Sequence, residues 1–235
     1  MVSPLIVALD VAEETEAVEL AGRLRPYVGG FKVGLELLMG AGPSVVSGVV
    51  ELGVPVFVDA KLHDIPNTVA RAAGRLGAIG ARWVTVHASG GEEMVRVAVE
   101  SLSESSEGRA GALAVTVLTS LDDRDLAVIG VGRDLGDQVA AMAQIGAGAG
   151  VEGVVCAVPE ASRVKRLGLG LTVVTPGIRP AGASSSDQRR VATPGQAIMA
   201  GADLLVVGRP ITAAPDPVAA AVAIGEEIAA AVSAT

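Results

Sequence analysis

Aromatic residues and cysteine are scarce in this sequence. Two Phe, one Trp and one Tyr occur among 235 residues, so Val, Ala, Leu and Ile must fill the hydrophobic core. Cys156 is the only cysteine, which excludes an intrachain disulfide and fits a reducing compartment. The sequence has only two His and lacks the spaced His and Cys ligands of a zinc site, although a carboxylate-bound Mg²⁺ stays open.

Positive charge is also in short supply. The 18 Lys and Arg residues are outnumbered by 26 Asp and Glu residues, which gives a formal net charge of −8. A surface of this sign repels nucleic acid and anionic membranes. We therefore expect no nucleic-acid partner, and any anionic ligand must be held by a local group of basic residues.

Long hydrophobic runs are missing. No apolar run reaches the roughly 18 residues that a membrane helix needs, and the first ten residues, MVSPLIVALD, lack the basic segment that opens a secretory signal. These absences, together with the single cysteine, predict a cytoplasmic protein without a membrane partner.

What the sequence does contain is a repeated alternation of two kinds of segment. Short apolar runs have the continuous character of strands that are buried on both faces. They occupy residues 5–10, 30–35, 55–62, 82–88, 112–119, 153–157, 171–177 and 204–209. Amphipathic or Ala-rich segments lie between them, and residues 12–27, 92–104 and 216–232 are typical of helices.

Eight strand–helix repeats in a chain of this length predict an α/β fold, a (β/α)8 TIM barrel. No Pro/Gly linker or break in composition marks a second domain, so residues 1–235 are expected to form a single domain. A doubly wound open sheet is the main alternative. The segment GAGVEG (148–153) matches the dinucleotide-binding pattern G-x-G-x-x-G, but it precedes a predicted strand instead of following one, so we interpret it as a helix-to-strand turn.

Candidate functional residues gather at one end of the predicted strands. In a barrel of this type the active site lies at the carboxyl ends of the strands. Ten charged, polar or glycine residues lie in or just after the carboxyl ends of the predicted strands. They are Asp10, Lys32, Asp59, Lys61, His87, Thr119, Ser120, Arg179, Gly208 and Arg209. We expect them to surround one site.

The segment FVDAKLHDIPNTV (57–69) places opposite charges at the end of an apolar strand. Strand side chains alternate, so Asp59 and Lys61 should point to the same side, roughly 6.6 Å apart along the strand, with Lys32 approaching from the next strand. A carboxylate beside each ammonium favours the charged form of both. A salt-bridge cluster that only helps to specify the fold is the alternative, but buried ion pairs are costly to desolvate, so a functional role is favoured.

A second group of residues follows the last two predicted strands. Arg179 lies in TPGIRP, and Gly208 and Arg209 lie in GRP. The loops at these places are the usual phosphate site of such barrels, because glycine lets backbone N–H groups approach an oxyanion and arginine supplies a planar fork of donors. The alternative is that Arg179 and Arg209 are surface residues that happen to precede prolines. Phosphate binding is favoured because both arginines follow the ends of predicted strands.

Taken together, these motifs resemble the orotidine 5′-monophosphate decarboxylase family. The resemblance covers nearly the whole chain and rests on LIVALD, FKVGLELL, FVDAKLHDIPNTV, VTVHASGG, VTVLTS, VVTPGIRP, DQRR and VVGRPIT, in that order. The pattern Asp-x-Lys-x-x-Asp alone is less specific, because related sugar-phosphate decarboxylases and aldolases share it. The lysine of FKVG and the phosphate motifs make the match specific.

The resemblance implies a role for each matching position. The charged tetrad would be Lys32, Asp59, Lys61 and Asp64, with Asp64 supplied by the partner subunit of a homodimer. The substrate-binding residues would be Asp10 and Lys32 at the ribose, Thr119 and Ser120 at the pyrimidine edge, Arg179, Gly208 and Arg209 at the phosphate, Gln188 over phosphate and base, and Asp59 and Thr68 beside them. His87 also matches the family pattern, and we assign it no chemical step.

The implied reaction is the conversion of orotidine 5′-monophosphate (OMP) to UMP and CO₂ in de novo pyrimidine biosynthesis, without a metal or other cofactor. Loss of CO₂ leaves a carbanion in the plane of the ring, and the Lys61 ammonium would stabilise that charge and deliver a proton. One alternative is a Mg²⁺-dependent sugar-phosphate decarboxylase or aldolase, although Lys32 stands where an extra cation disfavours a metal. Another is a barrel that senses UMP without turnover, but binding alone needs no proton donor such as Lys61.

Overall fold

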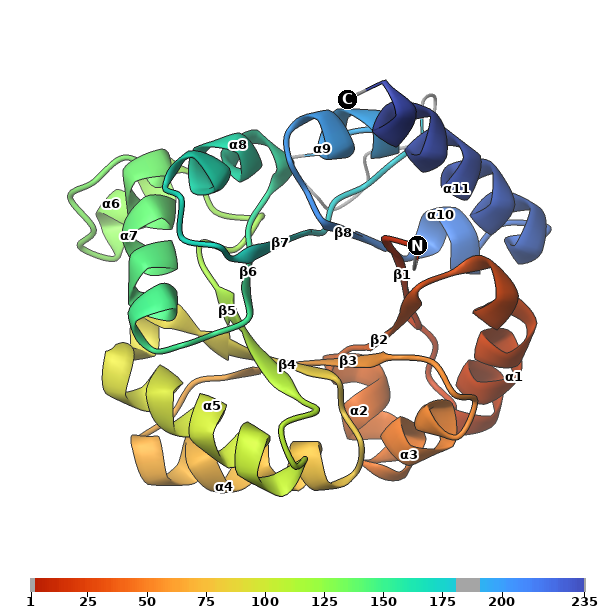
Figure 1. Cartoon of the computed structure of the whole chain (residues 1–235), viewed down its shortest axis with the longest axis horizontal. Coiled ribbons are helices and arrows are strands. Elements are labelled where there is room, and N and C mark those ends of the chain that lie inside the picture. Colours follow the sequence, from red (N-terminus) through yellow and green to blue (C-terminus); the bar gives the residue numbers. More distant parts are fainter. Residues whose placement is uncertain (1–2, 181–190, 235) are drawn as a thin grey trace.

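Eight parallel strands close into a barrel in this computed structural model, which describes residues 3–180 and 191–234. The strands follow one another around the barrel in sequence order, and β1 pairs with β8 to close it (Figure 1). Their bounds are β1 Leu5–Ala8, β2 Gly30–Val33, β3 Val56–Leu62, β4 Trp83–His87, β5 Gly111–Val115, β6 Gly153–Val155, β7 Thr172–Thr175 and β8 Leu204–Val207. The predicted (β/α)8 barrel is confirmed, and the open-sheet alternative is wrong.

Helices form a ring outside the strands (Figure 1). They are α1 Glu14–Leu24, α2 Leu35–Ala41, α3 Ser44–Val50, α4 Pro66–Ala78, α5 Glu92–Ser105, α6 Asp123–Val128, α7 Leu135–Gly148, α8 Val158–Arg166, α9 Pro194–Met199, α10 Arg209–Thr212 and α11 Pro217–Ser233, with short 3-10 turns η1 Arg25–Tyr27 and η2 Ala88–Gly90. The three helices predicted from periodicity correspond to α1, α5 and α11. In the part of the chain that the structure describes, no helix has the length and apolar character needed to cross a membrane.

The glycine-rich segment 148–153 is a turn between a helix and a strand. Gly148 ends α7 and Gly153 begins β6. Gly150 between them has φ of +82°, a conformation that glycine adopts without the steric cost of a side chain. The interpretation as a helix-to-strand turn is confirmed, so this pattern does not open a dinucleotide-binding helix.

The apolar side chains of the strands separate into two clusters. The larger cluster fills the space between the strands and the helices and includes Val7, Phe31 and Val84. The smaller cluster fills the barrel interior, and its buried members are Ile6, Ala8, Phe57, Trp83, Leu113, Val174 and Val206. Because side chains alternate along a strand, every strand except β2 contributes to both clusters, which explains the continuous apolar runs in the sequence; the inward positions of β2 are Gly30 and Lys32.

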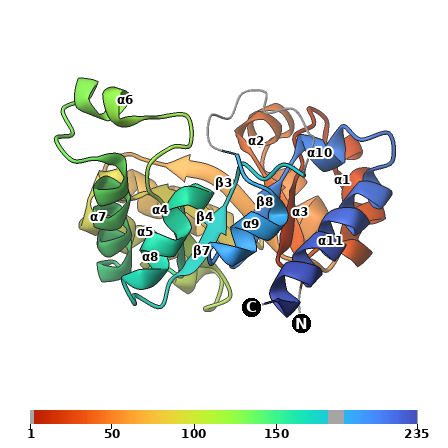
Figure 2. The same cartoon turned by 90° about the horizontal axis from the view of Figure 1, so that it is seen from above.

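The same alternation determines where the polar residues point. Two residues beyond Phe57 on β3 comes Asp59, and two beyond Trp83 on β4 comes Thr85, so both continue the inward-facing series. Asp10 follows the inward-facing Ala8 of β1 in the same way. The barrel therefore has an apolar plug below and a polar floor near the carboxyl ends of its strands. In side view, α6 and α10 lie at this end and both chain ends lie at the other (Figure 2).

A polar cluster joins β4 to the segment before β6. The Arg82 guanidinium donates two hydrogen bonds to the Glu152 carboxylate, at 2.7 and 2.6 Å, and Trp83 Nε1 donates a third at 2.9 Å. The guanidinium carbon of Arg82 also lies 4.6 Å from the centre of the Trp83 ring. Burial raises the pKa of Glu152, but the hydrogen bonds from Arg82 and Trp83 outweigh it, so the pKa lies below its ordinary value.

Replacing Glu152 with Ala should lower the free energy of unfolding by about 2 kcal/mol at pH 7, because Arg82 and Trp83 lose their acceptor. Because the pKa of Glu152 is lowered by folding, its stabilising contribution is fully present above pH 4.5, the ordinary pKa of a glutamate. The contribution is lost as the pH falls through the pKa that Glu152 has in the folded protein. Urea unfolding at equal protein concentration should show the difference from wild type shrinking between pH 7 and pH 3.5. Arg109→Ala, which breaks an exposed pair with Glu107, is the control and should change stability by less than about 0.5 kcal/mol.

Candidate active site

One cavity of about 490 Å³ opens at the carboxyl ends of the strands, a size suited to a small-molecule ligand. Eight of the residues predicted from sequence line it: Asp10, Lys32, Asp59, Lys61, Thr119, Arg179, Gly208 and Arg209. They come from β2 and β3 and from the segments that follow β1, β5, β7 and β8. The barrel therefore brings together residues that lie up to about 200 positions apart in the sequence.

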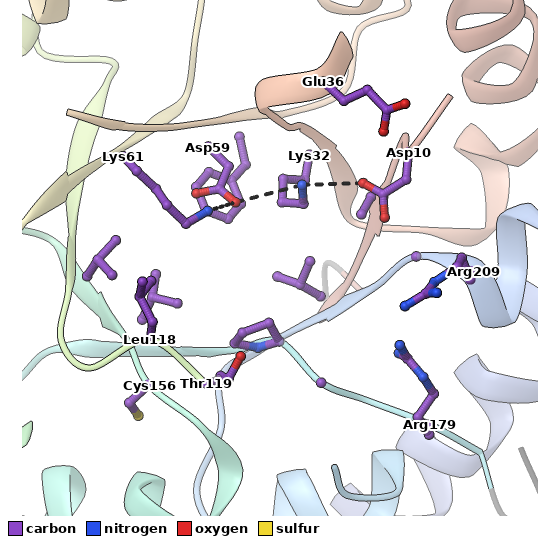
Figure 3. A pocket seen from close by; sticks show the side chains of 18 of the residues that line it. Asp10, Lys32, Glu36, Asp59, Lys61, Leu118, Thr119, Cys156, Arg179 and Arg209 are labelled. Carbon is purple, nitrogen blue, oxygen red and sulfur yellow. Dashed lines mark hydrogen bonds and ion pairs between the residues drawn. The ribbon is translucent and has the colours of Figure 1, made fainter. Parts of the chain in front are cut away.

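Two ammonium groups share one carboxylate oxygen on the cavity wall. Lys61 Nζ lies 2.7 Å from Asp59 Oδ2, and Lys32 Nζ lies 3.7 Å from the same oxygen. Lys32 Nζ also lies 3.6 Å from Asp10 Oδ1, so the four side chains form a continuous row of alternating charge (Figure 3). The Lys32 and Asp59 side chains are only 13% and 14% exposed, whereas Lys61 is 33% exposed and accessible to a ligand. The predicted approach of Lys32 to the Asp59–Lys61 pair is confirmed.

The pKa of Asp59 reflects this pairing. Burial alone raises the pKa of its carboxyl group, but the positive charges of Lys32 and Lys61, together with hydrogen bonds from Lys61 and Thr85, outweigh burial. The pKa of Asp59 therefore lies below its ordinary value, and the group is a carboxylate at neutral pH.

The strand that carries this pair is irregular. Val58 pairs with Val84, and the next pair along the two strands is Leu62 with Val86. Three residues of β3 therefore stand opposite a single residue of β4, and Lys61 adopts a φ of +47°, which is uncommon for a residue with a side chain. The prediction that Asp59 and Lys61 meet is confirmed, but the regular strand spacing on which it was based is wrong at this position.

Thr85 is a residue that the sequence reasoning missed. It is the single residue of β4 that faces the bulge, and it is fully buried. Its Oγ1 accepts a hydrogen bond from the Lys61 backbone N–H at 2.9 Å and donates one to Asp59 Oδ1 at 2.9 Å. The available signal was a threonine at an inward-facing position of an otherwise apolar strand.

Two glycines leave room for the charged row. A Cβ atom at Gly208 would lie 2.5 Å from Asp10 Oδ2, and one at Gly34 would lie 2.7 Å from Lys32 Nζ. Both distances are too short for any side chain to fit without displacing the charged group. The glycine expected at the phosphate site thus also has a steric role beside Asp10.

Arg179 and Arg209 form the second charged group of the cavity, and their side chains point toward one another (Figure 3). Arg179 is buried, its backbone N–H donates to Ala192 O at 2.9 Å, and its Nη1 donates to Ile178 O at 2.9 Å. Gly177, with φ of +82°, provides the turn that leads from β7 to Arg179. Two guanidinium groups directed into one space form a site for an anion.

Several predicted strand ends differ by a few residues from the structure. β5 ends at Val115, so Thr119 and Ser120 lie in the loop beyond it, and β8 ends at Val207, so Arg209 begins α10. The observed strands are shorter because their backbone leaves the barrel ladder before the apolar pattern stops. This corrects the bounds, but Thr119 and Arg209 still line the cavity.

The single chain does not bring every predicted residue to the cavity. Asp64, Thr68 and Ser120 are exposed and are absent from its lining. Asp64 lies on the segment between β3 and α4, and its Oδ1 accepts the Ile65 N–H at 2.6 Å. Gln188 and the rest of 181–188 lie outside the described residues. Within one chain, three members of the predicted tetrad are together.

An apolar wall faces the charged row across the cavity. Leu118 lies on this wall (Figure 3), and the other aliphatic side chains lining the cavity are Ala8, Val115, Val117, Val155 and Val206. Cys156 also lines the cavity, from a fully buried position just after β6. An apolar surface opposite fixed charges lowers the local dielectric constant and strengthens the electrostatic field that the charges exert on a bound ligand.

His87 lies beside the charged row, at the end of β4. Its ring centre is 5.3 Å from that of the exposed His63. Burial lowers the pKa of His87, and the neighbouring His63 and Lys61 lower it further against the opposite effect of Asp59, so His87 is neutral at pH 7. Across the described residues, no group of three or more His, Cys, Asp or Glu side chains is arranged to hold a metal ion.

The charge sharing at Asp59 predicts a specific titration behaviour. Carbon-13 NMR of the Asp59 carboxyl group should give a midpoint below 3.8, the ordinary value for Asp. Replacing Lys32 with Met should raise the midpoint, because burial then acts against one ammonium instead of two. An unchanged midpoint in Lys32→Met, in a protein whose amide spectrum shows it folded, would contradict the proposed balance.

Comparison with known proteins agrees with this geometry. The sequence model of the orotidine 5′-phosphate decarboxylase / HUMPS family matches residues 3–224. Proteins named orotidine 5′-phosphate decarboxylase are similar to this chain: that of Nitratidesulfovibrio vulgaris is 49% identical over 96% of this chain and 97% of its own length, and that of Sodalis glossinidius is 45% identical over 96% and 90%. The crystal structure of the Lactobacillus acidophilus orotidine 5′-phosphate decarboxylase superimposes with a TM-score of 0.83 at 36% identity, covering 96% of this chain and 99% of that one. The chain belongs to the orotidine 5′-phosphate decarboxylase / HUMPS family.

Proposed function

We propose that this protein is a carboxy-lyase that converts OMP to UMP and CO₂ in de novo pyrimidine biosynthesis. The observation that carries the proposal is the Lys61 ammonium, held 2.7 Å from Asp59 at a cavity that also contains Arg179 and Arg209. The names of relatives that are 45 to 49% identical over nearly the whole chain support the same activity. We further propose that the chain acts as a single domain in the cytoplasm.

The substrate would bind with its phosphate and its reacting carbon at opposite ends of the cavity. Arg179 and Arg209 would hold the phosphate, with the Gly208 backbone and Gln188 contributing. Asp10 and Lys32 would bind the ribose hydroxyls, and Thr119, with Ser120, would bind the pyrimidine edge. This arrangement directs C6 of the base toward Lys61, because Lys61 lies at the end of the charged row away from Asp10 (Figure 3).

The reaction breaks one carbon–carbon bond and forms one carbon–hydrogen bond. When CO₂ leaves, the electron pair of the broken bond stays on C6, in the plane of the ring. The Lys61 ammonium stabilises that pair as it develops and then donates a proton to C6, after which the neutral amine takes a proton from solvent. Lys32 helps to keep Asp59 ionised, and Asp59 holds the Lys61 ammonium in place at the site.

The fourth charge of the site would come from a second subunit. We propose a homodimer in which Asp64 of each chain reaches the cavity of the other, with Thr68 next to it. In one chain, Asp64 and the neighbouring Ile65 are exposed, and Ile65 is a large apolar residue with 66% of its surface accessible. An exposed apolar side chain beside a carboxylate, on the segment that follows the carboxyl end of β3, supports a subunit contact there.

Turnover of OMP is the direct test. We expect the purified protein to remove the orotate absorbance of OMP, release CO₂ and produce UMP, at a rate unaffected by EDTA. The alternative within the same family is a Mg²⁺-dependent reaction on a sugar phosphate. Activity that EDTA abolishes and Mg²⁺ restores, or failure to consume OMP alongside an active relative, would overturn the proposal.

The shared site can be tested by mixing two inactive variants. Lys61→Ala should lose several orders of magnitude in kcat while retaining UMP binding, because it removes the proton donor but leaves the phosphate site. Asp64→Ala should also be severely impaired. After unfolding and refolding of an equal mixture, half of the dimers are hybrids with one intact site each, so about a quarter of wild-type activity should return.

The control for this experiment is a mixture of Lys61→Ala with Asp59→Ala, two changes in the same chain's half of the site. It should not recover activity, because no hybrid contains an intact site. If the Lys61→Ala and Asp64→Ala mixture also stays inactive while size measurements show hybrids, Asp64 does not complete the neighbouring site.

A further inference from the structure

We propose that Thr85 is a positioning residue for the reaction, holding Lys61 and Asp59 in their working arrangement from the neighbouring strand. This inference rests on the proposed decarboxylation for its kinetic consequences. Thr85 does not line the cavity and lies beneath the charged row, so it acts through the two residues it contacts. The structure gives it one hydroxyl group with two hydrogen bonds, each to a different member of the charged site.

The ladder of hydrogen bonds between β3 and β4 is interrupted beside Thr85. Between the pairs Val58–Val84 and Leu62–Val86, β3 has three residues where β4 has one. Three residues cannot all pair with the backbone of one, so the bulge removes regular partners from the backbone of β3. The Thr85 hydroxyl accepts the Lys61 N–H at 2.9 Å and so takes the place of a carbonyl group of the ladder.

Lys61 has an unfavourable backbone conformation that needs a restraint. Its φ of +47° is in the left-handed region, which costs energy for a residue with a long side chain and persists only when the surroundings hold it. The hydrogen bond from its N–H to a fully buried threonine is one such restraint. Because the backbone direction at Lys61 determines where the side chain starts, releasing this bond moves the ammonium relative to the cavity.

Thr85 also orients the Asp59 carboxylate. Its two oxygens have separate partners: Oδ1 accepts from the Thr85 hydroxyl at 2.9 Å, and Oδ2 faces Lys61 Nζ at 2.7 Å and Lys32 Nζ at 3.7 Å. The hydroxyl proton is directed to Asp59 because the oxygen of the same group accepts from Lys61. One side chain thus fixes the rotation of the carboxylate and the backbone of the amine together.

Thr85→Val tests the hydroxyl with little change in shape. It leaves the Lys61 N–H without its acceptor and Asp59 Oδ1 without its donor, so we expect kcat to fall about 10- to 100-fold. The KM for OMP and the Kd for UMP should change by less than about threefold, because the phosphate site is untouched. Thr85→Ser restores the hydroxyl and should recover kcat to within about threefold of wild type.

A matched control is available on β7. Thr175 is, like Thr85, a fully buried threonine of a barrel strand, but its Oγ1 has no hydrogen-bond partner among the described residues, and it does not line the cavity. Thr175→Val makes the same chemical change without breaking a hydrogen bond, so kcat should stay within about twofold of wild type. If removing any buried hydroxyl group lowered activity, kcat would instead fall equally in Thr85→Val and Thr175→Val.

A second measurement reads the position of Lys61 without turnover. Amide hydrogen exchange at Lys61 should be faster by tenfold or more in Thr85→Val than in wild type, Thr85→Ser or Thr175→Val. Unchanged amide exchange at Lys61 in Thr85→Val would overturn the inference, whether or not the protein turns over OMP. Failure to turn over OMP would separately overturn the proposed function. If wild type turns over OMP and Thr85→Val retains its kcat, the inference fails and the proposed function stands.

Discussion

The sharing of Asp59 Oδ2 between Lys61 and Lys32 is the interaction on which the rest of the site depends. Placing an ammonium at a cavity mouth lined by aliphatic side chains is unfavourable, because burial penalises the charged form. One carboxylate oxygen at 2.7 and 3.7 Å from two ammonium groups offsets this cost for both of them. The arrangement holds the Lys61 ammonium against Asp59 while leaving it partly exposed to a ligand.

The barrel supplies this arrangement through elementary geometry. Alternation along parallel strands sends Phe57 and Trp83 into an apolar plug, and sends Asp59 and Thr85, two positions further on, into the layer above it. Gly34 and Gly208 leave the space that Lys32 and Asp10 occupy. The fold thus builds the charged row on rigid strands, so little reorganisation is needed when charge develops on a substrate.

The chain as a whole is negatively charged, whereas its cavity concentrates basic side chains. The sequence carries a formal net charge of −8, yet four basic residues, Lys32, Lys61, Arg179 and Arg209, converge on one cavity. A phosphate ester bearing a carboxylate would be repelled by much of the surface and attracted at this one place. In the proposed reaction, the separation of the arginines from the lysines would let binding energy at the phosphate hold the base beside Lys61, which is how remote contacts contribute to a rate.

The barrel and most of the candidate site could be predicted from the sequence, because the patterns that indicate them are local. Continuous apolar runs indicate strands buried on both faces, and eight of them alternating with helical segments predict a closed barrel. The strand ends then identify Asp10, Lys32, Asp59, Lys61, Arg179 and Arg209 as neighbours, since parallel strands present their carboxyl ends at the same edge. The apolar wall of the cavity was missed, because its aliphatic residues cannot be told from core residues by type.

The sequence by itself thus determined the barrel, the location of the site and the partners in its charged row. The tertiary structure alone decided the bulge in β3, the left-handed backbone of Lys61 and the two hydrogen bonds of Thr85. The reason is that these features depend on the register between β3 and β4, where the hydrogen bonds of Thr85 join residues 24 and 26 positions apart. No local propensity encodes such a register, because it is selected by the packing of both strands within the closed barrel.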